Sequence, residues 1–139
     1  ITKLPKDSSL VPLKAGEKTT LRDLLYGLML RSGNDAAVTI AVAVSGSVNK
    51  FVDKMNRRAQ ELGCTNTSFA NPHGYHNKNH YSTARDLAII ARESMKNAEF
   101  RKIVSTTSRS APSAGGTRRR WWTRSTWPLS SDDVTPPPR

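Results

Sequence analysis

The chain contains one cysteine and few aromatic residues. Because Cys64 has no second cysteine to pair with, no disulfide can form within these 139 residues, and a lone cysteine does not indicate a redox compartment. Aromatic residues make up 6% of the chain and hydrophobic residues 36%, which is low for a compact globular protein. The length nevertheless suffices for one modest domain with its own core.

Long apolar runs are also missing. No stretch of the sequence is long enough to span a bilayer as a helix. The first residues show neither the basic segment nor the apolar segment of a signal peptide. Because a mature secreted fragment and a truncated sequence would both look like this, the observation assigns no compartment.

Negative charge is scarce. Lys and Arg number 22 against 11 Asp and Glu, which gives a formal net charge of +11 at pH 7. Such a surplus is compatible with binding to nucleic acid or to an anionic surface, but it is more often the solvated surface of a basic protein. We expect no nucleic-acid partner, and we keep a basic nucleic-acid-binding module as an alternative.

The first two helices are predicted on either side of a short polar segment. Thr20 is a suitable N-cap with Asp23 three residues on, and apolar residues then follow at i, i+3, i+4 and i+7, at Leu21, Leu24, Leu25 and Leu28. Residues 36–44 are apolar nearly all round and predict a buried helix, although their β-branched residues also allow a strand. Asp35 is the expected cap of this second segment.

Three further helices are predicted from caps and spacing. Ser47 is the expected cap of a helix with one apolar face that Gly63 ends, and Ser82 or Thr83 the cap of the next. Asn97 is the expected cap of a short last helix. The inward residues of the helix after Thr83 are expected to be Leu87, Ile90 and Ala91.

From Thr107 onward no helical or strand periodicity is present. This segment contains every tryptophan of the chain and no lysine, and its runs are Arg118-Arg119-Arg120, Trp121-Trp122 and Pro136-Pro137-Pro138. We expect residues 107–139 to be disordered, and the abrupt change of composition near Thr106 suggests a shift of reading frame. The Arg–Trp run has the charge and the rings for stacking on nucleic acid, but it lacks the periodicity of a membrane-surface helix.

The tripeptide Ser32-Gly33-Asn34 separates the first two helical segments. Ser, Gly and Asn are ordinary residues at a helix end. At such a junction, however, a hydroxyl and a carboxamide can converge on a cleft. Acyl transfer from a peptide needs a proton delivered to the departing amine and a polar group that holds the substrate amide.

The segments around this tripeptide occur in the order found in the serine D-alanyl-D-alanine carboxypeptidases, the low-molecular-weight penicillin-binding proteins. The similar segments are residues 16–25, 55–63, 67–74 and 80–88. Together they cover about residues 8 to 106, and an ordered series is far more specific than a three-residue pattern. The resemblance implies an α/β transpeptidase-like fold, of which residues 1–106 would be mostly the helical portion, with few strands, and residues 107–139 a segment that does not match.

The resemblance also assigns the candidate site. The family acylates and deacylates a serine with three motifs, S-x-x-K, S-x-N and K-T-G. In the second, Ser32 would supply the hydroxyl of a proton relay, and Asn34 would hydrogen-bond the substrate backbone and the catalytic lysine. No S-x-x-K precedes Ser32 and no K-T-G is present, so we expect the nucleophile and the general base to be absent. Ser47 and Lys50 have the S-x-x-K spacing, but Ser47 stands where a helix N-cap belongs.

The resemblance further implies a hydrolase that trims the terminal D-alanine of peptidoglycan stem peptides ending in D-Ala-D-Ala. It would act outside the cytoplasmic membrane through an acyl-serine intermediate that β-lactams trap, without a cofactor, and the complete protein could associate with the membrane. The chain as given is expected to be an inactive fragment. The alternative is a non-catalytic relative that binds peptidoglycan.

Three histidines, His73, His76 and His80, lie close together in the sequence. Imidazoles at short spacing can bind a transition metal. This spacing fits no established zinc site and no fourth ligand is evident, so we expect no metal.

Overall fold

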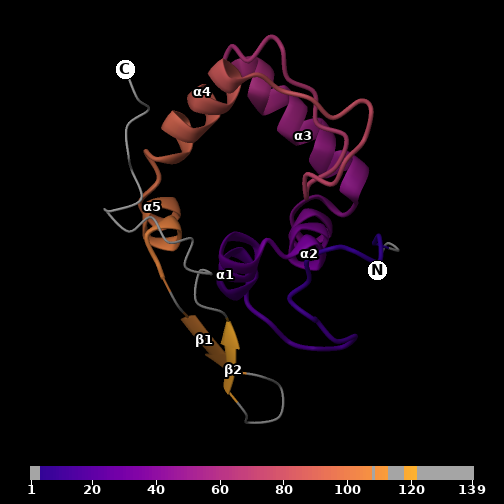
Figure 1. The fold of residues 1–139 in the computed structure, drawn as a ribbon, viewed down its shortest axis with the longest axis vertical. Coiled ribbons are helices and arrows are strands. Elements are labelled where there is room, and N and C mark those ends of the chain that lie inside the picture. Colours follow the sequence, from indigo (N-terminus) through magenta and orange to yellow (C-terminus); the bar gives the residue numbers. More distant parts are fainter. Residues whose placement is uncertain (1–3, 108, 113–117, 122–139) are drawn as a thin grey trace, which may run out of the picture.

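The computed structural model describes residues 4–107, 109–112 and 118–121. In these residues five helices precede two short strands: α1 (Leu21–Arg31), α2 (Asn34–Ser45), α3 (Val48–Glu61), α4 (Ala84–Ser94), α5 (Ala98–Val104), β1 (Arg109–Pro112) and β2 (Arg118–Trp121). The helices follow one another around a ring, with the strands beyond α1 and α5 (Figure 1). The prediction of a mostly helical chain with few strands is confirmed.

The helix beginnings are set by local capping residues. Thr20, Ser47, Thr83 and Asn97 each accept a first-turn backbone N–H through the side chain, which satisfies a group that has no partner inside its own helix. At the C-terminal end of α2, Gly46 adopts φ 76°, in the left-handed region that glycine enters without strain. The predicted caps are confirmed here, and Thr83 rather than Ser82 is the cap of α4.

The start of α2 differs from its prediction. The segment is a helix, but it begins at Asn34 with Gly33 in the N-cap position. Asp35 is therefore not the cap: it lies inside the first turn and is 7% exposed. The reason is tertiary, because its carboxylate accepts hydrogen bonds from residues that precede α1.

The core lies where α1 and α2 meet the segment that precedes α1. Val11, Leu24, Ala36 and Ile40 form its buried cluster. Partly buried residues pack against this cluster: Leu13, Leu25 and Leu28. Most residues of α2 are buried, as expected of a helix that is apolar on nearly all sides.

The expected inward face of α4 is wrong. Leu87 is 53% exposed, Ala91 is exposed, and Ile90 is only half-buried. The buried side chain of α4 is instead that of Asp86, whose Oδ2 accepts hydrogen bonds from the Asn66 N–H (2.9 Å) and the Thr67 hydroxyl (2.8 Å). The Asp86 carboxylate thus bonds α4 to the loop after α3. The inward face was mispredicted because helical spacing indicates an apolar face but not whether a neighbouring element covers it.

The two strands correct the expectation for the last part of the chain. β1 and β2 pair antiparallel, with Arg109 opposite Trp121 and Pro112 opposite Arg118, so the absence of strands expected beyond Thr107 is wrong at these positions. Such short arginine-rich strands have weak sequence signals, and they are defined by pairing with each other and by the contact of β2 with α1. Residues 108, 113–117 and 122–139, also expected to be disordered, lie outside the described residues.

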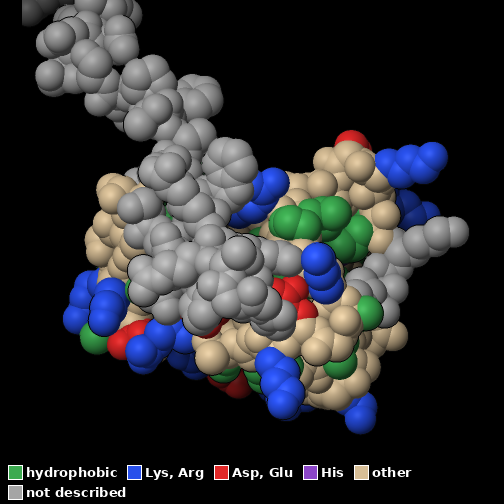
Figure 2. All heavy atoms as spheres, turned by 90° about the horizontal axis from the view of Figure 1, so that it is seen from below, with side chains coloured by type: hydrophobic (Ala, Val, Ile, Leu, Met, Phe, Trp, Pro, Cys, Tyr) green, Lys and Arg blue, Asp and Glu red, His purple; other side chains and the backbone are tan. Residues whose placement is uncertain are grey.

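Basic side chains lie at several separate places on the face that Figure 2 shows. In Figure 2 the Lys and Arg side chains are spread around the edge of the visible face. No single described helix is long and apolar enough to cross a membrane. Helices α2 and α3 satisfy that length and composition test only as a pair, and they are bent by 86° relative to each other.

The carboxylate of Asp86 yields a stability prediction. Asp86→Ala removes the carboxylate that accepts the part-buried hydrogen bonds of the Asn66 N–H and the Thr67 hydroxyl, and a hydrogen bond to a charged group contributes about 1.5–3 kcal/mol. We expect urea unfolding to show a fall of about 2 kcal/mol in the free energy of unfolding. The control is Asp53→Ala on the exposed side of α3, which should change it by less than about 0.5 kcal/mol. Equal unfolding midpoints for the two variants would contradict the assigned role of Asp86.

Candidate functional site

Ser32 stands at the junction of α1 and α2 in a strained backbone conformation. It ends α1 with φ 58° and ψ 37°, and among the described residues it is the only non-glycine residue with a positive φ. This left-handed conformation costs a residue with a side chain about 1–2 kcal/mol. Such strain persists only where the surroundings impose it, and it is typical of functional sites.

Gly33 is required by a close approach rather than by its backbone angles. Its φ of −65° is open to any residue. A Cβ at this position would lie 2.2 Å from Cγ2 of Val11 and 3.2 Å from Oδ1 of Asp35. The absence of a side chain at Gly33 therefore lets the segment around Val11 pack directly against the junction.

That segment, residues 9–13, is named the strap. The Ser9 carbonyl accepts a hydrogen bond from the Asn34 N–H (2.9 Å), and the Ser9 hydroxyl donates to the Arg31 carbonyl (2.7 Å). The Arg31 Nε–H donates in turn to the Leu10 carbonyl. The strap thus bonds Arg31, the residue before Ser32, and Asn34, which is two residues after it.

The Asp35 carboxylate also binds the strap, through hydrogen bonds to its backbone. Its Oδ1 accepts hydrogen bonds from the Val11 N–H and the Ala36 N–H, both at 2.9 Å, and its Oδ2 accepts from the Leu13 N–H at 3.2 Å. The sequence pattern predicted only a capping role for Asp35 and not this contact with the strap. A usable signal was present, since an acidic residue inside an apolar helix has to find partners when it is buried.

The side chains of Ser32 and Asn34, two residues apart in the chain, differ in their exposure. Asn34 is 8% exposed and Ser32 is exposed. The described part of the chain offers neither side chain a hydrogen-bond partner. A carboxamide has two donor hydrogens and an acceptor oxygen, so the junction presents groups able to bind the amide of a ligand.

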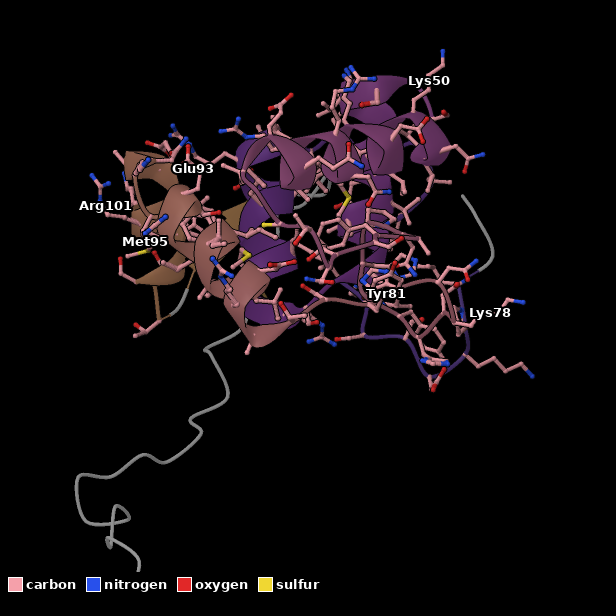
Figure 3. The ribbon with its side chains drawn as sticks, turned by 90° about the horizontal axis from the view of Figure 1, so that it is seen from above. Lys50, Lys78, Tyr81, Glu93, Met95 and Arg101 are labelled. Carbon is pink, nitrogen blue, oxygen red and sulfur yellow. The ribbon has the colours of Figure 1, made fainter. Side chains whose placement is uncertain are left out.

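The second serine with a lysine three residues on is a helix cap. The Ser47 hydroxyl oxygen accepts from the backbone N–H of Lys50 at 3.2 Å. The Lys50 side chain points away from the molecule (Figure 3). The backbone of Lys50, and not its ammonium group, therefore meets the serine.

A cavity lies elsewhere, between α3 and α4. Its volume is about 200 Å³, and it is lined by Met55, Arg58, Ala59, Leu62, Phe69 and Ile90. None of these residues belongs to the Ser32–Asn34 junction. The cavity marks a place where the apolar sides of α3 and α4 do not close on each other.

The three histidines occupy the loop between α3 and α4. Nδ1 of His73 accepts from the Tyr75 N–H (3.1 Å), and Nδ1 of His80 accepts from the Ala70 N–H (3.2 Å), so each ring has one nitrogen engaged by the backbone. His76 is exposed. In the described part of the chain no three His, Cys, Asp or Glu side chains are placed to hold a metal ion.

The same loop yields a pH prediction. Burial, and secondarily the nearby His80, lower the pKa of His73 below its ordinary 6.5. Because the folded state then binds the proton less tightly than the unfolded state, the stabilisation is complete above about pH 6.5 and is lost as the pH falls through the folded pKa. His73→Asn keeps an acceptor for the Tyr75 N–H but cannot be protonated, so stability should fall less below pH 6.5.

Urea unfolding at pH 5 and pH 7.5 measures this difference. His76→Asn, which alters an exposed ring, should keep the pH dependence of the original chain. If His73→Asn also keeps it in full, His73 is not the group responsible.

Comparison with known proteins places these features in a family. The family model of D-alanyl-D-alanine carboxypeptidase matches residues 2–133. The carboxypeptidase DacF of Bacillus subtilis is 47% identical over 94 residues, which are 68% of this chain and 24% of DacF. The D-alanyl-D-alanine carboxypeptidase of Streptomyces strain K15 is 44% identical over 124 residues, covering 83% of this chain and 41% of that protein.

Solved structures show the same fold. A mutant of the Streptomyces K15 DD-transpeptidase matches with a TM-score of 0.80 and 40% identity, over 90% of this chain and 52% of that one. A D-alanyl-D-alanine carboxypeptidase from Mycobacterium tuberculosis matches with a TM-score of 0.77 and 35% identity, over 91% and 49%. The chain therefore spans about half the length of these structures, and less than half of the curated relatives.

The family match also extends beyond the motifs that suggested it. The predicted resemblance covered residues 8 to 106, whereas the match continues to residue 133. A division of the chain after residue 106 and a shift of reading frame there stay predictions. The match over almost the whole sequence, joined to a shared fold at 35–40% identity, shows that this chain belongs to the D-alanyl-D-alanine carboxypeptidase family.

Proposed function

We propose that this chain is the helical portion of a serine-type D-alanyl-D-alanine carboxypeptidase, and that Ser32 and Asn34 are its S-x-N pair. The observation that carries the proposal is the junction itself. It combines a strained serine with an exposed hydroxyl and a largely buried carboxamide, and neither side chain has a hydrogen-bond partner among the described residues.

The geometry suits the two roles. With its backbone N–H bound to Ser9, Asn34 keeps its carboxamide for a ligand, where it can hydrogen-bond the amide of a substrate peptide. The Ser32 hydroxyl both donates and accepts a hydrogen bond, so it can pass a proton to the departing amine. Preorganised polar groups of this kind contribute to the rate because they need no reorganisation during the reaction.

The proposed substrate is a peptidoglycan stem peptide ending in D-Ala-D-Ala. The complete protein would release the terminal D-alanine through an acyl-serine intermediate, and β-lactams would trap that serine. This chemistry belongs outside the cytoplasmic membrane, where peptidoglycan is found, and association of the complete protein with the membrane stays part of the proposal. The nucleophile and its base would come from outside these 139 residues.

The chain by itself should therefore be inactive. We expect no release of D-alanine from a D-Ala-D-Ala peptide and no covalent labelling by a fluorescent penicillin. Mass spectrometry after incubation with penicillin measures the latter directly. Acylation of Ser47, the one serine with S-x-x-K spacing, would overturn this assignment and make Ser47 a nucleophile.

Substitutions at the pair test the proposed roles in the complete protein. Ser32→Ala should lower kcat by about 10²–10⁴-fold, as the loss of a proton-transfer group does. Asn34→Ala should lower it by about 10²–10³-fold, as the loss of one oriented donor does. Asn49→Ala, at an exposed position on α3, is the control and should leave kcat unchanged.

Ser32→Gly separates stability from activity at the same position. Glycine enters the left-handed region without strain, so this variant should unfold at a higher urea concentration and gain about 1 kcal/mol. It should lose activity to the same extent as Ser32→Ala, because both lack the hydroxyl. Normal turnover in Ser32→Gly would show that the hydroxyl has no part in the reaction.

A further inference from the structure

We propose that Asp35 is a positioning residue for the Ser32–Asn34 pair, and that it acts on the pair through the strap. The proposal rests on the proposed function of that pair. Asp35 is not expected to touch the substrate. Its effect would pass through residues 9–13, which connect its carboxylate to both sides of Ser32.

The connection can be followed bond by bond. The Asp35 carboxylate accepts hydrogen bonds from the backbone N–H groups of Val11 and Leu13. These are alternate residues of the strap, and the N–H groups of alternate residues in an extended segment point to the same side. Two residues earlier, Ser9 bonds the Asn34 N–H through its carbonyl and the Arg31 carbonyl through its hydroxyl. One strap residue thus holds both the end of α1 and the beginning of α2.

The chemistry of this contact specifies a carboxylate. A carboxylate has two oxygens that only accept hydrogen bonds, which matches donors on both sides. Its position in the first turn of α2 also favours a negative charge. In Asp35→Asn the new NH₂ group would face a strap N–H, so one of the two strap bonds would become a donor–donor contact.

Gly33 gives an independent way to displace the same segment. Because an added Cβ would lie 2.2 Å from Cγ2 of Val11, a buried side chain of the strap, Gly33→Ala forces Val11 or the junction to shift while the Asp35 carboxylate stays intact. If the strap transmits the effect of Asp35, the two variants should disturb the pair in the same way.

Asp86 provides a matched control. It is also a buried aspartate in the first turn of a helix, and it also accepts a loop backbone N–H. Its loop, however, follows α3 and is not the strap. Asp86→Asn should therefore lower stability through the same kind of loss without altering the Ser32–Asn34 pair.

The first experiment is NMR on the full 139-residue chain, in which the side-chain NH₂ signals of Asn34 are assigned. We expect Asp35→Asn and Gly33→Ala to shift these signals, and Asp86→Asn to leave them in place. Unchanged Asn34 signals in both Asp35→Asn and Gly33→Ala would overturn the proposal, as would an equal shift in Asp86→Asn. If Asp35→Asn does not fold, Gly33→Ala decides the question.

The second experiment measures turnover of a D-Ala-D-Ala peptide by the complete protein. Asp35→Asn and Gly33→Ala should lower kcat by about 10–100-fold, as small misplacements of reacting groups do, with KM changed much less. Asp86→Asn should keep kcat within about twofold, in line with a substitution outside the reacting geometry. An equal loss of kcat in Asp35→Asn and Asp86→Asn would reduce Asp35 to a structural role.

The two experiments also separate this proposal from the proposed function. If Asn34→Ala leaves turnover unchanged, the function assigned to the pair fails. The NMR result then still decides whether Asp35 positions Asn34 through the strap.

Discussion

The carboxylate of Asp35 joins the beginning of α2 to a segment more than twenty residues earlier in the chain. An anion removed from water is stable only when hydrogen-bond donors replace its hydration, and here three backbone N–H groups do so. This requirement seats the strap, and with the strap Val11, a member of the buried core cluster. The core and the Ser32–Asn34 junction therefore depend on the same buried charge.

Asp86 repeats this arrangement at α4, where a carboxylate again bonds the backbone of a preceding loop. Apolar burial contributes less in this part of the molecule, since Leu87 and Met95 are about half exposed and a cavity separates α3 from α4. Exposed apolar surface of this kind is typical of a face that packs against another element. It is consistent with a chain that spans about half the length of the solved structures sharing its fold.

At the junction the serine and the glycine stand in the reverse of the positions that their backbone preferences favour. Ser32 occupies a left-handed conformation that glycine would adopt at lower cost, while Gly33 occupies a conformation open to any residue. The order becomes understandable when the side chains are considered: the strained position carries the hydroxyl, and the unstrained one needs the space for Val11. Stability is thus reduced locally at the place where the proposed function needs a polar group.

The sequence by itself determined the helix beginnings after Thr20, Ser47 and Asn97, and it narrowed the cap of α4 to Ser82 or Thr83, because a cap depends on residues within one turn of it. It also determined the family, through the ordered motifs around Ser32 and Asn34. Only the tertiary structure decided that Asp35 serves the strap, that Leu87 stays exposed, and that β1 and β2 pair. The first depends on partners more than twenty residues away and the second on the absence of a covering neighbour, and neither spacing nor propensity records which residues meet. The two strands are close in the chain, but their residues have weak strand propensity.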